Sequence, residues 1–117
     1  MPEIEIIRTA VALDHLRALV EGLFGEFVKA VVGVERGLMA IGGDLHADDE
    51  ALLLEAGSSR PDLWGVNLHP DRHGESDRIE FDSIINVRPR RGNQSRSVDD
   101  AEMRRRIAEI VDVLVQP

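Results

Sequence analysis

The segment "NVRPRRGNQSR", residues 86–96, gathers side chains that could bind an anion. It contains four arginines and no acidic residue. Guanidinium groups form bidentate hydrogen bonds with phosphates and carboxylates, and a glycine lets the backbone approach a ligand closely. A helix that starts just after the segment would add free N–H groups and a favourable dipole. We therefore predict an anion-binding loop, to which these residues would contribute: Arg88, Arg90, Arg91, Asn93, Ser95 and Arg96.

The same arginines could instead pair with acidic groups of the protein itself. The chain has 22 acidic residues against 14 lysines and arginines, which gives a net charge of -8. Asp100 or Glu102 could also occupy the helix start that an external anion would need. If the loop does bind a ligand, we expect an anionic small molecule or an acidic protein segment. An acidic body and a loop without aromatic side chains argue against nucleic acid.

A second candidate site combines Asp44 with His46, which together could perform acid–base chemistry in a small enzyme. Other histidines and carboxylates nearby in the sequence are of the types that bind divalent metals; they are His69, His73, Asp48, Asp49, Asp71, Glu75 and Asp77. Their spacing matches no ligand motif, and a solvated polar turn explains them equally well. We expect neither a metal nor another cofactor.

A third candidate is a polar face on the last two predicted strands. If Asn67 pairs with Asp82 and His69 with Glu80, these four side chains share one face with Asn86. Such a face could perform acid–base chemistry. It could equally face solvent or form the contact surface of a homo-oligomer.

The elements that must position these residues follow from apolar periodicity and from turn residues. The order is helix, two strands, helix, two strands, helix, and the predicted ranges are 12–24, 27–34, 38–43, 46–57, 63–68, 78–88 and from about residue 99 onward. Gly25 is placed to end the first helix, and Asp99 with Glu102 has capping-box spacing at the start of the last. Residues 3–7 form either a short strand or an extended lead-in.

This order predicts a single α+β domain over residues 1–117. We expect a four-stranded, largely antiparallel sheet, made of two hairpins that flank a short helix, with the N- and C-terminal helices packed mainly on one face. The strand–helix–strand unit from Leu38 to Leu68 should make its two strands parallel. The arginine loop would then lie at the opposite end of the sheet from Asp44 and His46.

Composition excludes several classes of protein. The chain has no cysteine, so neither disulfides nor thiolate chemistry is available. It has no apolar run of the length that a membrane span requires, and its first residues do not resemble a signal peptide. We expect a cytoplasmic protein with no membrane association.

Three motifs carry a resemblance to a known family: Gly42 to Asp48, Leu63 to Gly65, and the Arg-Pro-x-x-Gly-Asn-x-Ser pattern from Arg88 to Ser95. On these residues the chain resembles a family of small prokaryotic proteins catalogued only as a domain of unknown function. It departs from the family pattern at His69, where tyrosine is expected, and at Gln94, where arginine is expected. The resemblance implies shared motifs and no particular activity, and the first departure weakens a metal site built on His69.

Overall fold

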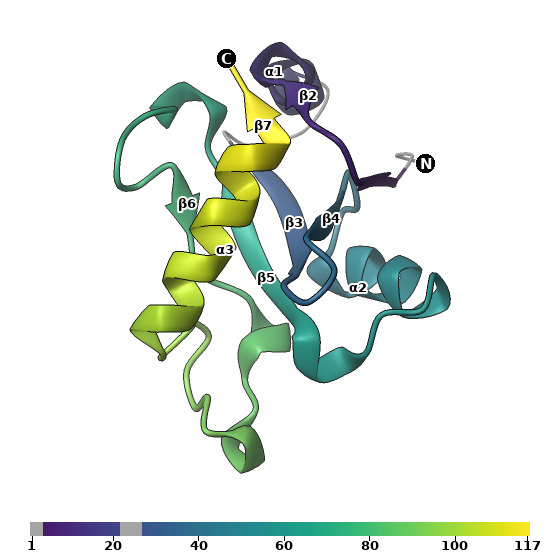
Figure 1. Ribbon diagram of the computed structural model, residues 1–117, viewed down its shortest axis with the longest axis vertical. Coiled ribbons are helices and arrows are strands. Elements are labelled where there is room, and N and C mark those ends of the chain that lie inside the picture. Colours follow the sequence, from purple (N-terminus) through teal and green to yellow (C-terminus); the bar gives the residue numbers. More distant parts are fainter. Residues whose placement is uncertain (1–3, 22–26) are drawn as a thin grey trace.

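The computed structural model describes residues 4–21 and 27–117 and shows an α+β fold with a five-stranded sheet (Figure 1). The strand order is β1-β4-β3-β5-β6, and every neighbouring pair is antiparallel. The strands of this sheet are β1 (Glu5–Ile7), β3 (Val28–Gly33), β4 (Leu38–Ile41), β5 (Leu63–Leu68) and β6 (Ile79–Glu80). A second, two-stranded sheet pairs β2 (Val11–Ala12) in parallel with β7 (Val115–Gln116).

The predicted fold class is confirmed, but the sheet has five strands and not four. The fifth strand is β1, near the N-terminus. The sequence was compatible there with either a short strand or an extended lead-in. β1 pairs with β4 from Glu5↔Ile41 to Ile7↔Met39. Its three residues are too few for periodicity to decide, and the pairing with β4 makes the segment a strand.

Three α-helices accompany the sheet: α1 (Leu13–Glu21), α2 (His46–Glu55) and α3 (Ala101–Leu114). The predicted end of the first helix at Phe24 and Gly25 lies outside the described residues. The last helix begins slightly later than predicted, because Asp100 is the residue before its first turn. The Asp100 carboxylate accepts a hydrogen bond from the backbone N–H of Glu102 at 3.0 Å, which satisfies one of the free donors of that turn.

The helices lie on both faces of the sheet. α1 and α3 cover one face, where Leu16 and Ile107 pack with Val32 and Val66 in the larger apolar core. On the other face Leu53 of α2 packs in a second core. The N- and C-terminal helices therefore share one face, as predicted. Covering both faces explains why β3 and β4 are apolar at almost every position.

The strands β4 and β5 run in the same direction, as predicted, because both are antiparallel to β3, which lies between them. This arrangement fixes the two ends of the sheet. Val28 pairs with Leu68 at one end, where Lys29 donates a hydrogen bond to the backbone carbonyl of Asp44 at 2.7 Å. Gly33 pairs with Leu63 at the other end.

The predicted strand over residues 78–88 is wrong beyond its first residues. β6 contains only Ile79 and Glu80, and residues Ile84–Asn86 form a 3-10 helix, η3. The predicted register is also wrong, because Asn67 pairs with Glu80 and not with Asp82. The strand ends early because, beyond β6, the side chain of Asn86 and not a strand backbone forms hydrogen bonds with the edge of β5.

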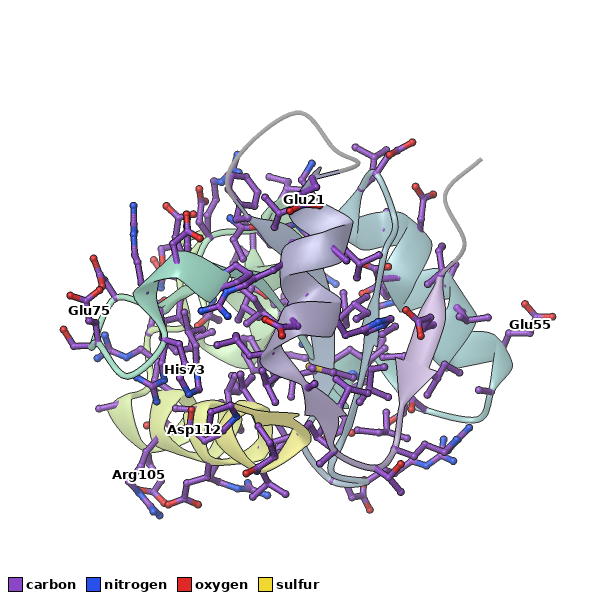
Figure 2. The ribbon with its side chains drawn as sticks, turned by 90° about the horizontal axis from the view of Figure 1, so that it is seen from above. Glu21, Glu55, His73, Glu75, Arg105 and Asp112 are labelled. Carbon is purple, nitrogen blue, oxygen red and sulfur yellow. The ribbon has the colours of Figure 1, made fainter. Side chains whose placement is uncertain are left out.

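Charged side chains surround this body. Glu55, Glu75 and Arg105 point outward from three separate parts of the surface (Figure 2). Of the helices in the described part of the chain, none combines the length and apolar character that a bilayer crossing requires.

Candidate functional site

The side chain of Asn86 anchors the arginine loop to the outer edge of β5. Its Oδ1 accepts a hydrogen bond from the backbone N–H of Gly65 at 2.8 Å, and its Nδ2 donates to the carbonyl of Gly65 at 2.9 Å. The same Nδ2 donates to the carbonyl of Arg96 at 2.9 Å, which ties the two arms of the loop together. Asn86 is fully buried. The side-chain amide of Asn86 therefore pairs with the N–H and the carbonyl of Gly65, as the backbone of a neighbouring strand would.

Gly65 is needed for this anchoring because the loop passes very close to it. A Cβ atom on Gly65 would lie 2.5 Å from the Cβ of Ser83, well inside contact distance. Ser83 is itself buried and begins η3, where its hydroxyl accepts a hydrogen bond from the N–H of Ile85 at 3.3 Å. The glycine of the Leu-Trp-Gly motif therefore serves packing.

Arg88 acts as a second anchor through hydrogen bonds to backbone carbonyls. Its guanidinium donates to Ile85 at 3.1 Å, to Pro61 at 3.4 Å and, over a shorter distance, to Leu63. The group also stacks on the ring of Trp64, 4.7 Å from its centroid. Burial lowers the pKa of Arg88. Each of its three guanidinium nitrogens donates one hydrogen bond within the protein.

Asn93 closes the loop from the other side. Its Nδ2 donates to the carbonyls of Asn86 and Ser97, each at 2.7 Å, and its Oδ1 accepts from the N–H of Asp99 at 2.7 Å. Gly92, with φ of 83°, ends the short 3-10 helix η4, Pro89–Arg91, in the left-handed conformation that glycine adopts without strain. The Arg-Pro-x-x-Gly-Asn motif thus builds a closed turn.

Two further residues of the predicted anion site are engaged with acids of the chain. The Ser95 hydroxyl donates to the Asp99 carboxylate, and the Nε of Arg96 donates to the Asp82 carboxylate at 2.7 Å. The hydrogen bond from Ser95 also contributes most to lowering the pKa of Asp99. Ser95 and Arg96 are therefore paired with acidic groups of the protein itself, which was the alternative to an anion site.

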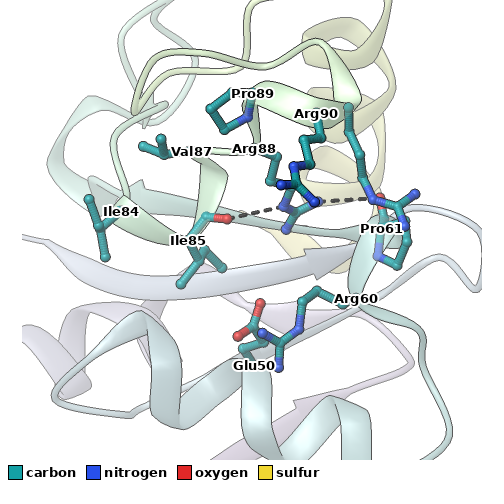
Figure 3. Close-up of a pocket in the computed structure, with 10 residues that line it drawn as sticks. Glu50, Arg60, Pro61, Ile84, Ile85, Val87, Arg88, Pro89 and Arg90 are labelled. Carbon is teal, nitrogen blue, oxygen red and sulfur yellow. Dashed lines mark hydrogen bonds between the residues drawn. The ribbon is translucent and has the colours of Figure 1, made fainter.

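Arg90 and Arg91 differ from the rest of the loop. They occupy the tip of the closed turn, are exposed, and make no side-chain hydrogen bond or ion pair with any residue that the structure describes. They line a groove of about 570 Å³ between the loop and α2 (Figure 3). The other residues that line the groove are Glu50, Arg60, Pro61, Ile84, Ile85, Val87, Arg88 and Pro89.

The opposite wall of the groove carries two charged residues that the sequence did not indicate. Arg60 is exposed, and its guanidinium has no partner among the described residues. Glu50 of α2 is only 8% exposed, and its carboxylate has no hydrogen bond to the described residues either. In the view of Figure 3 the Glu50 carboxylate points toward Arg88, whereas the Arg60 side chain extends toward Glu50. Glu50 reaches the groove through the packing of α2 on the sheet, and Arg60 through the short 3-10 helix Arg60–Asp62 that precedes β5. No local sequence pattern indicates that the two meet the arginine loop.

At the other end of the sheet, Asp44 and His46 do not form a joint acid–base pair. His46 is half-buried and donates from Nε2 to the carbonyl of Val66 at 2.9 Å. Burial lowers its pKa, against the opposing effects of that hydrogen bond and of Asn67 nearby. The carboxylate of Asp44 is exposed and has no hydrogen bond to His46.

The predicted polar face is present in part and adjoins His46. Asn67 donates to the Glu80 carboxylate at 2.9 Å, and the Nε2 of His69 lies 3.5 Å from the same carboxylate. Asn67 and His69 are buried, so this group is not an open solvated face. Asn86 belongs to the loop anchor instead. The described residues contain no group of three or more histidine or acidic side chains arranged to hold a metal ion.

The glycine pair before α2 also serves a structural contact. The N–H of Gly43 donates to the Oδ1 of Asp49 at 3.0 Å, and a Cβ on Gly43 would lie 2.7 Å from the same oxygen. Asp49 is fully buried, and its Oδ2 has no hydrogen-bond partner among the described residues. Burial raises the pKa of Asp49 to about 8, although the Gly43 hydrogen bond opposes the rise.

Comparison with known proteins agrees with the resemblance that the motifs carry. No curated protein and no solved structure matches the chain. A family model described as "Protein of unknown function (DUF5674)" matches residues 5–114, which include the three motifs and every residue of the groove. The chain therefore belongs to the DUF5674 family of proteins of unknown function.

Proposed function

We propose that this chain is a binding module that holds an anionic ligand in the arginine-lined groove. One observation carries the proposal: the guanidinium groups of Arg60, Arg90 and Arg91 line one groove of about 570 Å³ without a partner among the described residues. A groove of this size is typical of ligand sites in proteins. Bidentate donors in it suit a phosphate or a carboxylate.

The contrast with other arginines of the chain supports this proposal. Arg96 pairs with Asp82, and Arg105 pairs with both Glu102 and Glu109. Exposed Arg8, Arg104 and Arg106 also lack a side-chain partner among the described residues, so an unpaired guanidinium alone does not mark a site. The tip of the loop nevertheless presents two adjacent guanidiniums away from the described acids, on a frame held by buried hydrogen bonds. Because the backbone of this loop is already ordered, binding needs to order only the arginine side chains.

Thermal unfolding in inorganic phosphate tests the proposal. At constant ionic strength, phosphate should raise the melting temperature, since a ligand at 100 times its dissociation constant adds about 2.7 kcal/mol of stability. The rise should disappear in Arg90→Ala/Arg91→Ala.

The matched control is Arg8→Ala/Arg17→Ala, which removes two exposed arginines beside β1 and within α1, at the far end of the molecule from the loop (Figure 1). This variant loses the same charge and should keep the response. If both double variants lose it equally, phosphate acts through net charge and the groove is not the site.

The alternatives have weaker support. For an enzyme built on Asp44 and His46, the two side chains would need to act together, whereas His46 is engaged with Val66. For a homo-oligomer built on the polar face, Asp82 would need to be free, whereas it pairs with Arg96. We also propose that the module acts in the cytoplasm, since a chain without cysteine has no need of an oxidising compartment.

A further inference from the structure

We infer that the ligand of the groove is an acidic peptide segment of a partner protein that carries an apolar side chain among its acidic residues. This inference rests on the proposed function and names the class of ligand. Three features of the groove point to it: an apolar end, a carboxylate between the arginines, and free guanidiniums on separate walls.

The apolar end of the groove is formed by Ile84, Ile85 and Val87. Ile84 is 66% exposed, the largest exposed fraction among the large apolar side chains that the structure describes. In Figure 3 Ile84 and Ile85 lie at one end of the groove, and Arg60 and Arg90 lie toward the other. A small inorganic anion would use only the arginine end. A ligand that covers both ends also removes apolar surface from water, which favours binding.

Glu50 places a second requirement on the ligand. The residue is only 8% exposed, and its carboxylate, in the groove wall, accepts no hydrogen bond from the described residues. This carboxylate weakens the attraction that the arginines exert on a ligand with negative charge alone. A peptide offers backbone N–H donors in addition to its acidic side chains, so it can satisfy Glu50 and the arginines together.

The free guanidiniums do not converge on one point. Arg60 lies on the wall beside α2 and Arg90 lies on the loop (Figure 3), which also carries Arg91. Arg88, which lies between them, is already bonded to backbone carbonyls. Separate positive groups on two walls are complementary to carboxylates spaced along an extended chain. The volume of about 570 Å³ holds only a few residues of such a chain.

Fluorescence anisotropy with a labelled peptide tests the inference. The probe is an acetylated and amidated peptide in which one leucine stands between two pairs of glutamates. We expect it to bind wild-type protein, to bind Arg8→Ala/Arg17→Ala equally, and to lose binding in Arg90→Ala/Arg91→Ala. A second probe with serine in place of leucine should bind about tenfold more weakly, because burying a leucine side chain is worth at least 1.4 kcal/mol.

The variant Ile84→Ser isolates the apolar contribution. Because Ile84 is mostly exposed, we expect the variant to fold normally, which its circular dichroism and melting temperature would show. Ile84→Ser should reduce the affinity for the leucine peptide to that for the serine peptide.

The outcomes separate the two proposals. If phosphate acts at Arg90 and Arg91 but the leucine and serine peptides bind equally well, the peptide inference is wrong and the anion-binding function stands. The inference is also wrong if wild-type protein binds the leucine peptide no better than Arg90→Ala/Arg91→Ala does. If, in addition, phosphate has no effect on either protein, both proposals are wrong.

Discussion

Arg88 and Arg90 stand two positions apart in one loop, yet their side chains do different things. Arg88 is half-buried, stacks on Trp64 and bonds to backbone carbonyls, whereas Arg90 is exposed and free of described partners. The two side chains point in different directions. The backbone bridge between Arg88 and Asn93 closes the turn, so that Arg88 faces inward and Arg90 lies at the tip. A sequence shows the charge of each residue and not this direction.

A buried acid, Asp49, gives a prediction about pH. Because burial raises its pKa to about 8, the folded protein keeps a proton that the unfolded chain releases above about pH 4. The free energy of unfolding should therefore fall as the pH rises from about 4 to 8. Asp49→Asn keeps the acceptor for the N–H of Gly43 and cannot ionise. It should be more stable than wild type by a few kcal/mol at pH 7 and equally stable near pH 4.

Urea unfolding of both proteins between pH 4 and pH 8.5 measures this difference. His46 has the opposite effect on stability at lower pH, since burial lowers its pKa and the folded state resists its protonation. That contribution is present in both proteins and cancels in the comparison. A difference that is constant with pH would mean that Asp49 stays ionised in the folded protein.

At the scale of elements, the notable feature is an edge of β5 that is completed by a side chain. Asn86→Ala should leave the N–H and carbonyl of Gly65 without partners in a buried position. We expect a loss of about 2 to 4 kcal/mol in stability, because each unsatisfied buried group costs roughly 1 to 3 kcal/mol. Hydrogen exchange should show faster exchange at the Gly65 amide than at amides of β3 and β4.

Asp82→Asn provides the comparison within the same loop. It breaks the exposed ion pair with Arg96, and such pairs contribute less than about 1 kcal/mol. The exchange rate at Gly65 should therefore stay close to that of wild type. If both variants lose the same stability, the loop is held by charge and not by the amide of Asn86.

The same edge marks the limit of what the sequence could predict. Apolar runs and turn residues correctly predicted the β3–β4 hairpin, α2, β5 and α3, because each of these patterns is local. The alternating pattern of residues 79–88 resembled a strand, and only the tertiary contact between Asn86 and Gly65 makes it a loop. In the candidate site, too, local features could be predicted and tertiary contacts could not. Its arginines were visible in the sequence, whereas Glu50 and Arg60 reach the groove only through tertiary packing, from α2 and from the 3-10 helix before β5.

At the scale of the whole molecule, the distribution of charge predicts two opposite effects of salt. The net charge of -8 gives repulsion within the folded body, which salt screens. Raising sodium chloride from 20 to 500 mM should therefore raise the melting temperature. The same change should weaken binding of the glutamate–leucine peptide, since that contact joins opposite charges.

Calorimetry and anisotropy in one salt series measure both trends. Arg90→Ala/Arg91→Ala should be stabilised by salt more than wild type, because it changes the net charge from -8 to -10 and so increases the repulsion that salt screens. A melting temperature that falls with salt would mean that internal ion pairs outweigh the repulsion.

The closed turn from Arg88 to Asn93 has one more consequence. Its frame is held by Asn86, Arg88 and Asn93, and none of these contacts involves the side chains at positions 90 and 91. We expect those two positions to accept side chains other than proline at position 91, where the backbone N–H donates to the carbonyl of Arg88, without disturbing the rest of the fold. A library built there, on a small cysteine-free chain, would offer protein engineers a compact display scaffold whose recognition residues are decoupled from its stability.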